Sequence, residues 1–123
     1  MPTSKTFPFP HERLDAWHIS RMARKTALAF TASLPTGFGD EARQLDNAAA
    51  SVVRNIAGGA NRFRPAEKVL KFEIAAGGAG EAVSAVISLQ DSGHGDEALA
   101  QQFCQLEARV GAMLTGLIRR HRK

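Results

Sequence analysis

The stretch RNIAGGANRFR, residues 54–64, decides how this chain folds. Asn55 lies in an apolar helical pattern, the pair Gly58–Gly59 follows it, and two arginines flank Phe63 at the end. Glycine inside a helix costs about 1 kcal/mol relative to alanine, so the pair needs a structural or functional reason. Three interpretations are available: a loop that binds phosphate, a surface loop, or a helix that packs closely against a neighbour.

The glycines favour close helix packing over the two loop interpretations. A phosphate-binding loop would follow a strand and continue into Lys-Ser/Thr, and this stretch has neither feature. One helix later, Gly77, Gly78 and Gly80 stand in an apolar pattern whose helical period continues through them, which argues against a surface loop. We therefore expect Gly59 and Gly77 to let a neighbouring helix approach, while a surface loop remains the alternative.

Asn55 is expected to hold two helices together. It lies about 80° from the apolar line of its own helix, among the small residues Ala48, Ser51 and Gly59. A half-buried amide without a hydrogen bond costs about 1–3 kcal/mol. The side chain is therefore expected to bond to the backbone of the next helix. Direct contact with a ligand is the alternative.

Prolines and turn residues divide the chain into four helices. Pro35 and Pro65 stand where a helix must stop or start, and no alternating run is long enough to indicate a strand. Asp40 is expected to cap the second helix, and Pro65 to lie in the first turn of the third. The expected helices cover about residues 12–33, 41–61, 66–91 and 96–120.

Four helices of this length with short connections predict an all-α fold, an up-down-up-down antiparallel four-helix bundle. No repeat or linker divides the chain, so residues 1–123 are expected to form a single domain. The apolar positions expected in the core are Leu14, Trp17, Met22 and Leu28, with the alanines between them, in the first helix; Leu45, Ala49, Val52 and Ile56, with Phe63 on the same line, in the second; Val69, Phe72, Ala76, Ala79, Val83 and Val86 in the third; and Leu99, Phe103, Leu106, Val110, Met113, Leu114, Leu117 and Ile118 in the fourth.

The third helix has a second face without charge. A helix that is apolar on both sides is normally covered on both sides, and a single four-helix bundle covers only one. This pattern predicts that the protein is a homo-oligomer. The residues of this second face are Leu70, Ile74, Gly77, Gly78, Ala85 and Leu89.

Composition and charge limit the classes of function. The formal net charge is +4 and the pI about 9.8, which permits binding to nucleic-acid phosphates without establishing it. Cys104 is the only cysteine, so no internal disulfide forms and a reducing compartment is indicated. We find no run of about eighteen apolar residues in the sequence. The first thirteen residues, MPTSKTFPFPHER, do not resemble a secretory signal. A cytoplasmic protein without a membrane partner is expected.

The sequence gives little support for catalysis or a metal. A di-iron bundle needs Glu-x-x-His motifs, and none occurs. His11, Asp15 and His18 share one face of the first helix, where a metal is the alternative to ordinary solvated side chains. Cys104 follows Phe103 in the fourth helix and is expected to pack rather than react. We therefore expect no cofactor, no metal and no enzymatic activity.

The stretch from Gln44 to Ala82 resembles the 23S rRNA intervening-sequence protein family, a four-helix bundle family that includes the accessory proteins of diversity-generating retroelements. Its motif is roughly Gln-Leu, two basic residues, Ala-Ala, Ser, Asn-Ile-Ala-Glu-Gly and Arg, with Ile-Ala-x-Gly-Ser-x-x-Glu one helix later. The resemblance covers about residues 12–120. The matching residues are Leu14, Trp17, Leu34, Pro35, Gln44, Leu45, Ala48, Ala49, Ser51, Asn55, Ile56, Ala57, Gly59, Arg62, Ile74, Ala75, Gly77 and Glu81.

This resemblance implies a ring-like homopentamer, and, for the retroelement accessory proteins, binding to RNA and to a reverse transcriptase. It also implies structural, helix-packing roles for Asn55, Gly59, Gly77 and Glu81. The chain departs from the motif at Asp46 and Asn47, which replace the two basic residues, and at Gly58 and Gly78, which replace Glu and Ser. The loss of two positive charges weakens any binding to nucleic acid that the family implies.

Two functions remain open for a protein of this kind. In the first, exposed cations bind RNA or DNA weakly and without sequence preference; their residues are Arg54, Arg62, Arg64, Lys68 and Lys71, with the basic tail from Arg119. In the second, the protein is an oligomeric adaptor for another protein, and its charge is incidental. Solvated surface cations without a ligand are the alternative to the first.

Overall fold

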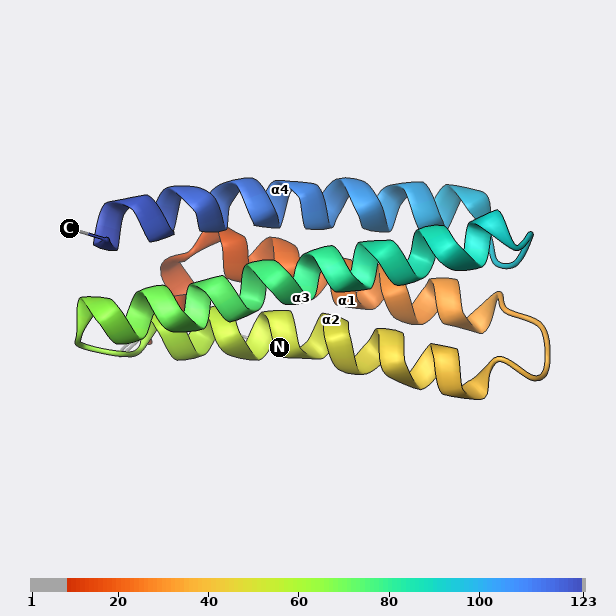
Figure 1. The fold of residues 1–123 in the computed structure, drawn as a ribbon, viewed down its shortest axis with the longest axis horizontal. Helices are drawn as coiled ribbons and strands as arrows, with labels where there is room; N and C mark the ends of the chain where they lie inside the picture. The colour runs from red at the N-terminus through yellow and green to blue at the C-terminus, as the bar shows by residue number, and fades with distance from the viewer. Residues whose placement is uncertain (1–8, 123) are drawn as a thin grey trace.

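A computed structural model of the chain describes residues 9–122, and this part is helical without any strand. A short 3-10 turn, η1 (Pro10–Arg13), precedes α1 (Asp15–Ala32), α2 (Gly39–Ala60), α3 (Pro65–Asp91) and α4 (Glu97–His121). Figure 1 shows the four α-helices lying side by side along one axis. The predicted all-α four-helix bundle is therefore confirmed. Residues 1–8, most of the segment in which no secretory signal was expected, lie outside the described residues.

Each helix packs against two others. α1 and α3 both contact α2 and α4 but not each other, so they occupy opposite corners of the bundle. The outward faces of α1 and α3 therefore point in opposite directions. Short connections join consecutive helices, which gives the antiparallel order that the helix lengths predicted.

The helix ends differ from the prediction by up to three residues. α1 begins at Asp15 because Pro10–Arg13 forms a separate 3-10 turn and Leu14 is extended. Asp40 does not cap α2 as expected; Phe38 takes that position and Asp40 lies in the first turn. Pro65 opens α3 as predicted.

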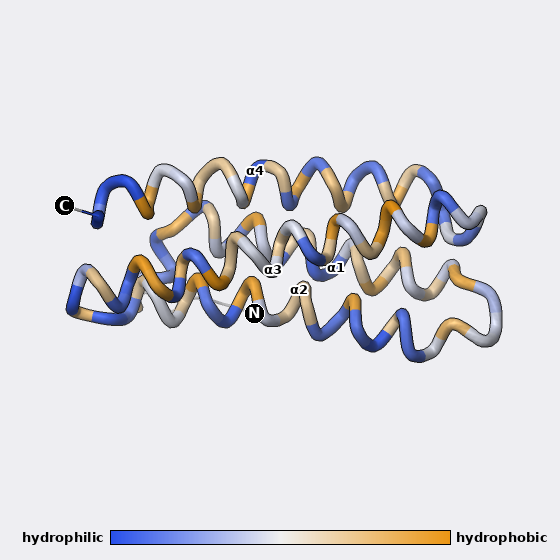
Figure 2. The backbone as a smooth tube through the Cα atoms, in the orientation of Figure 1, coloured by the Kyte–Doolittle hydropathy of each residue, from blue (hydrophilic) through white to orange (hydrophobic). Residues whose placement is uncertain are grey.

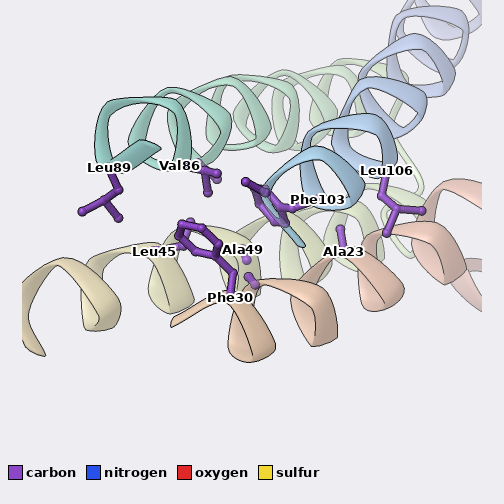
Figure 3. Close-up of a cluster of buried hydrophobic side chains, with 11 residues drawn as sticks. Ala23, Phe30, Leu45, Ala49, Val86, Leu89, Phe103 and Leu106 are labelled. Carbon is purple, nitrogen blue, oxygen red and sulfur yellow. The ribbon is translucent and has the colours of Figure 1, made fainter. Parts of the chain in front are cut away.

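Aromatic and aliphatic side chains from all four helices fill the core, as Figure 3 shows for the half that contains Phe30 and Phe103. α1 contributes mainly small residues to it, among them Ala16, Ser20, Ala23 and Ala27, which let the other helices approach closely. The prediction that Met22 and Leu28 face the core is wrong, because both are about half exposed on the outer side of α1.

The two glycines expected to serve helix packing, Gly59 and Gly77, differ in their surroundings. A Cβ atom on Gly59 would lie 2.7 Å from the Phe72 ring, so only glycine fits there without a shift. Gly78 also packs tightly, since a Cβ would lie 3.3 Å from Val52. Gly77, in contrast, has open space around it, and so it does not serve packing within the chain.

α3 is apolar on its outer side as well as its inner side. Its core residues are Phe72, Ala75, Ala79, Ala82, Val86 and Leu89. The predicted inner-face residues Phe72, Ala79 and Val86 are thus buried, and Val69, Ala76 and Val83 are partly buried. Leu89, which was expected on the second face, belongs to the core. On the outer side Leu70, Ile74 and Ile87 are 56%, 45% and 49% exposed.

α3 is also the one described helix that is long and apolar enough to cross a membrane by length and composition. Every eighteen-residue window of α3 contains Glu81, so this helix is not the uninterrupted run of about eighteen apolar residues that the sequence was found to lack. In the fold, α3 packs against α2 and α4.

Candidate nucleic-acid interface

The turn between α2 and α3 places two arginines at one end of the bundle. α2 stops at Ala60 and α3 starts at Pro65, with four residues between them. Between these points Arg62 and Arg64 are exposed, and Arg64 makes only a long contact of 3.5 Å with Glu67. An ion pair that is this long and exposed contributes little, so both guanidinium groups can contact phosphates.

The two lysines of α3 are less free than the arginines. Lys68 Nζ donates to the carbonyl of Ala60 at 2.9 Å and to that of Gly59 at 3.3 Å. The aliphatic stem of Lys71 lies over Gly58. A Cβ atom placed on Gly58 would be in ordinary van der Waals contact with this stem. Lys68 is thus part of the fold, whereas only the stem of Lys71 is in contact with α2.

The C-terminal end of α4 lies at the same end of the bundle as this turn (Figure 1). Arg122 forms an ion pair with Glu73 of α3, and the His121 ring lies 6.2 Å from the Phe72 ring. Arg119 and Arg120 are exposed on the same last turn. Figure 2 shows hydrophilic residues both at this end of α4 and at the α2–α3 turn.

The pKa of His121 is affected by this accumulation of positive charge. Burial lowers the pKa of its imidazole, and the nearby charges of Lys68 and Arg120 lower it further. Lys68 belongs to α3 and Arg120 to α4, so cations from two helices act on one side chain. The arrangement therefore concentrates positive charge across elements that are far apart in sequence.

Charge is distributed unevenly along the bundle axis. We define the basic end by its cations Arg13, Arg62, Arg64, Lys68, Lys71, Arg119, Arg120 and Arg122, which outnumber the carboxylates Glu12, Asp15, Glu67 and Glu73 there. At the opposite end, the acidic end, the carboxylates are Asp40, Glu41, Asp91, Asp96 and Glu97, and Arg43 is paired with Asp40 at 2.8 Å. A polyanion is therefore attracted to one end and repelled by the other.

Arg54 does not join the basic end directly. It is exposed on α2, about 9 Å along the axis from the last residue of that helix. Asp46, one of the two departures from the family motif, pairs with Arg24 of α1 at 3.1 Å. The middle of the α1–α2 surface is thus partly neutralised.

Phe63 is the largest difference between the predicted and the observed site. It was expected on the core line of the second helix, but its side chain is 96% exposed. The reason is that α2 ends three residues earlier, so the helical period no longer applies at this position. An exposed aromatic ring between two arginines is therefore part of the basic end.

Asn55 also differs from its expected role. Its amide donates to the carbonyl and to the hydroxyl of Ser51, at 2.9 and 3.0 Å, within α2 itself. The expected bond to a neighbouring helix is wrong, because Ser51 one turn earlier offers two acceptors at shorter reach. Glu81 is exposed on the outer side of α3, where Gly77 also lies.

The histidines near the N-terminus contact the protein instead of gathering around a metal. His11 Nδ1 lies 2.9 Å from the side-chain amide nitrogen of Asn61, and His18 Nε2 lies 2.8 Å from the carbonyl of Glu12. Within residues 9–122 no group of three His, Cys, Asp or Glu side chains could hold a metal ion. These contacts instead tie η1 to α2 and to α1.

Cys104 and Glu107, one turn apart in α4, form the most perturbed titratable pair. Glu107 is 2% exposed, and neither carboxylate oxygen has a hydrogen-bond partner within the described part of the chain. Burial raises the pKa of Glu107 to about 7, and burial together with Glu107 raises the pKa of the Cys104 thiol. A catalytic cysteine needs a lowered pKa, so this thiol is not an activated nucleophile.

Comparison with known proteins places the sequence in one family. The sequence model of the family described as 23S rRNA-intervening sequence protein matches residues 12–116. A search among curated proteins gave no match. The matched range includes α1, α2, α3 and most of α4, and with them the turn that carries the exposed arginines.

Proposed function

The chain belongs to the 23S rRNA-intervening sequence protein family, and on that basis we propose that it is a non-enzymatic, oligomeric protein that binds RNA or DNA weakly and without sequence preference. The family is not a known enzyme family. One observation carries the proposal: the cations of the α2–α3 turn and of the α4 C-terminus meet at the basic end. The proposed place of action is the cytoplasm.

The nature of the contacts supports weak, sequence-independent binding. Arg62, Arg64 and Arg120 are exposed and can reach phosphates, which are identical along any nucleic acid. A few phosphate contacts provide modest affinity for one copy of the chain. Several copies in one assembly would present several basic ends, and a long strand could bind more than one of them.

Assembly into a homo-oligomer, with a pentamer as the proposed form, is supported by the outer side of α3. Leu70, Ile74 and Ile87 expose large apolar side chains there, and the small residues between them allow a close approach. The same surface supports the alternative function, an oligomeric adaptor that contacts another protein, of which a reverse transcriptase is the proposed example. The two functions differ in whether binding to nucleic acid occurs at all.

Fluorescence anisotropy with a labelled oligonucleotide tests the proposal. Affinity should fall by about tenfold or more between 50 and 200 mM salt if two or three phosphates are neutralised. Simultaneous change of Arg62, Arg64 and Arg120 to Glu should abolish binding. The matched control, Lys25, Arg43 and Arg109 to Glu, changes the net charge equally away from the basic end and should retain most of the binding.

Two results would contradict the proposal. The first is equal loss of binding in both triple variants, which would assign the effect to net charge alone. The second is the absence of binding to any nucleic acid at 50 mM salt, which would favour the adaptor.

A further inference from the structure

We infer that the basic end recognises unpaired nucleic acid strands, and that Phe63 does so by stacking its ring on a nucleobase. This inference rests on the proposed function and adds the class of nucleic acid to it. Three features carry it: the exposure of the ring, the stiffness of the turn that presents it, and the arginines on both sides.

The exposure of Phe63 is not required by the fold. Full burial of a phenylalanine side chain contributes about 1.5–3 kcal/mol, and at 96% exposure this contribution is absent. A polar residue would serve equally well in a four-residue turn. The ring is therefore available for a ligand, and substitution at this position should leave the bundle intact.

The turn holds the Phe63 backbone from both sides. Upstream, Asn61 N donates to the carbonyl of Ala57 at 3.0 Å, and the Asn61 side chain contacts His11 of η1. Downstream, Arg64 caps α3 in an extended conformation, and its carbonyl accepts from Lys68 N at 3.0 Å. Because the turn is anchored in this way, little conformational entropy is lost when the ring meets a ligand.

The chemistry of the surroundings favours an unpaired base. Aromatic side chains stack on single-stranded bases with about 1–3 kcal/mol per base, while cations beside them contact the backbone. Arg62 and Arg64 are the immediate neighbours of Phe63, so both kinds of contact are possible within one nucleotide or two. In a duplex, the base faces are covered by neighbouring base pairs, and the ring would find no partner.

A lipid surface fits this end less well than a nucleic acid does. Stable attachment to a membrane needs two signals, and one ring with a few cations supplies only a small apolar area. Both sequence neighbours of Phe63 are arginines. Between Arg64 and Val69 the only apolar residues are Pro65 and Ala66, which are small. Vesicles of anionic phospholipid are therefore included in the test as the competing ligand.

The test compares a labelled twelve-nucleotide oligoadenylate with a blunt-ended, two-strand duplex of similar phosphate number and no unpaired bases, at 50 mM salt. Phe63→Ala should weaken binding to the single strand about 5- to 150-fold, the range to which a stacking energy of about 1–3 kcal/mol corresponds. Binding to the duplex should change less than twofold. Phe63→Leu should behave like Phe63→Ala, whereas Phe63→Trp should retain the affinity of the wild type, because the ring and not apolarity alone is required.

The outcomes separate this inference from the proposed function. If Phe63→Ala binds the single strand normally while the Arg62, Arg64 and Arg120 reversal abolishes binding, stacking is rejected and the basic end stands. Equal weakening for single strand and duplex also rejects stacking. Absence of binding by the wild-type protein rejects the proposed function and the inference together. Binding to anionic vesicles that requires Phe63, with unchanged binding to oligoadenylate, assigns the ring to a membrane and overturns the inference.

Discussion

The ammonium of Lys68 donates to the main-chain carbonyl of Ala60 at 2.9 Å, and so α3 closes the C-terminal end of α2. The last carbonyls of a helix have no partner within it, and a cation there also interacts favourably with the helix dipole. Lys68 therefore has a structural role at the edge of the basic end. This separates it from Arg62, which is exposed only one residue beyond the helix cap.

We predict that Lys68→Met mainly affects stability, whereas Arg62→Met mainly affects binding to nucleic acid. Lys68→Met should lower the free energy of unfolding by about 1 kcal/mol, the contribution of a typical hydrogen bond, with a small change in binding. Arg62→Met should weaken binding to nucleic acid and leave stability unchanged. Urea denaturation and anisotropy measure the two effects. A Lys68→Met protein with normal stability and binding as weak as that of Arg62→Met would show that Lys68 contacts the ligand.

Gly59 and Gly116 form a matched pair for the packing hypothesis. Gly59→Ala would place a Cβ 2.7 Å from the buried Phe72 ring, and overpacking of this kind costs about 1–3 kcal/mol. Gly116 lies in α4 with open space around it, so Gly116→Ala should stabilise the protein by up to about 1 kcal/mol through helix propensity. Thermal melts of both variants check this. If Gly59→Ala is as stable as Gly116→Ala, close packing is not the reason for the glycine.

Glu107 predicts an unusual dependence of stability on pH. Its pKa is about 7 in the folded protein against 4.5 for the ordinary side chain, so the folded state binds the proton more tightly. The contribution of this group to stability is therefore full below about pH 4.5 and falls as the pH rises to about 7. The difference amounts to about 3 kcal/mol.

Glu107→Gln keeps the shape of the side chain and removes the charge, so it tests this directly. Urea midpoints should decrease for the wild type between pH 5 and pH 8 and decrease less for Glu107→Gln. At pH 8 the variant should be the more stable of the two proteins. A wild-type midpoint that rises over the same pH range, with Glu107→Gln less stable at pH 8, would mean that the ionised carboxylate is stabilised by a partner.

The outer side of α3 predicts self-association. Light scattering at micromolar concentration should give the mass of an oligomer, and Leu70→Glu with Ile74→Glu should shift it towards the monomer, because charge would be placed in an apolar interface. Ala112→Glu, on the exposed side of α4, serves as the control and should leave the mass unchanged. A wild-type monomer under these conditions would contradict the interface.

Helix number and type could be predicted from the sequence because the signals are local. Pro65 and the glycine-containing turns mark the helix ends, and the apolar period identifies the buried face of α2 from Leu45 to Ile56. The stripe expected in the first helix was only partly right: its alanines, such as Ala23 and Ala27, are buried in the core. Met22 and Leu28 gave a stronger apolar signal although they lie outside.

The candidate site could be predicted only in part. The arginines of the α2–α3 turn are visible in the sequence, but their proximity to Arg120 depends on how α4 packs against α3. Phe63 was assigned to the core because the helical period was continued past the end of α2, where it has no meaning. A hydrogen bond within a helix, like that from Asn55 to Ser51, competes with a tertiary one, and sequence alone does not decide between them.

The most direct test of the central claim, that nucleic acid binds at the basic end, is to map where a bound strand lies. A short RNA that contains 4-thiouridine is cross-linked to the wild-type protein, and mass spectrometry identifies the attached peptides. The account predicts cross-links within residues 61–71 and 119–122, with none at residues 37–43 or 91–97 of the acidic end. Cross-links concentrated at the acidic end, or spread evenly over the surface, would contradict it.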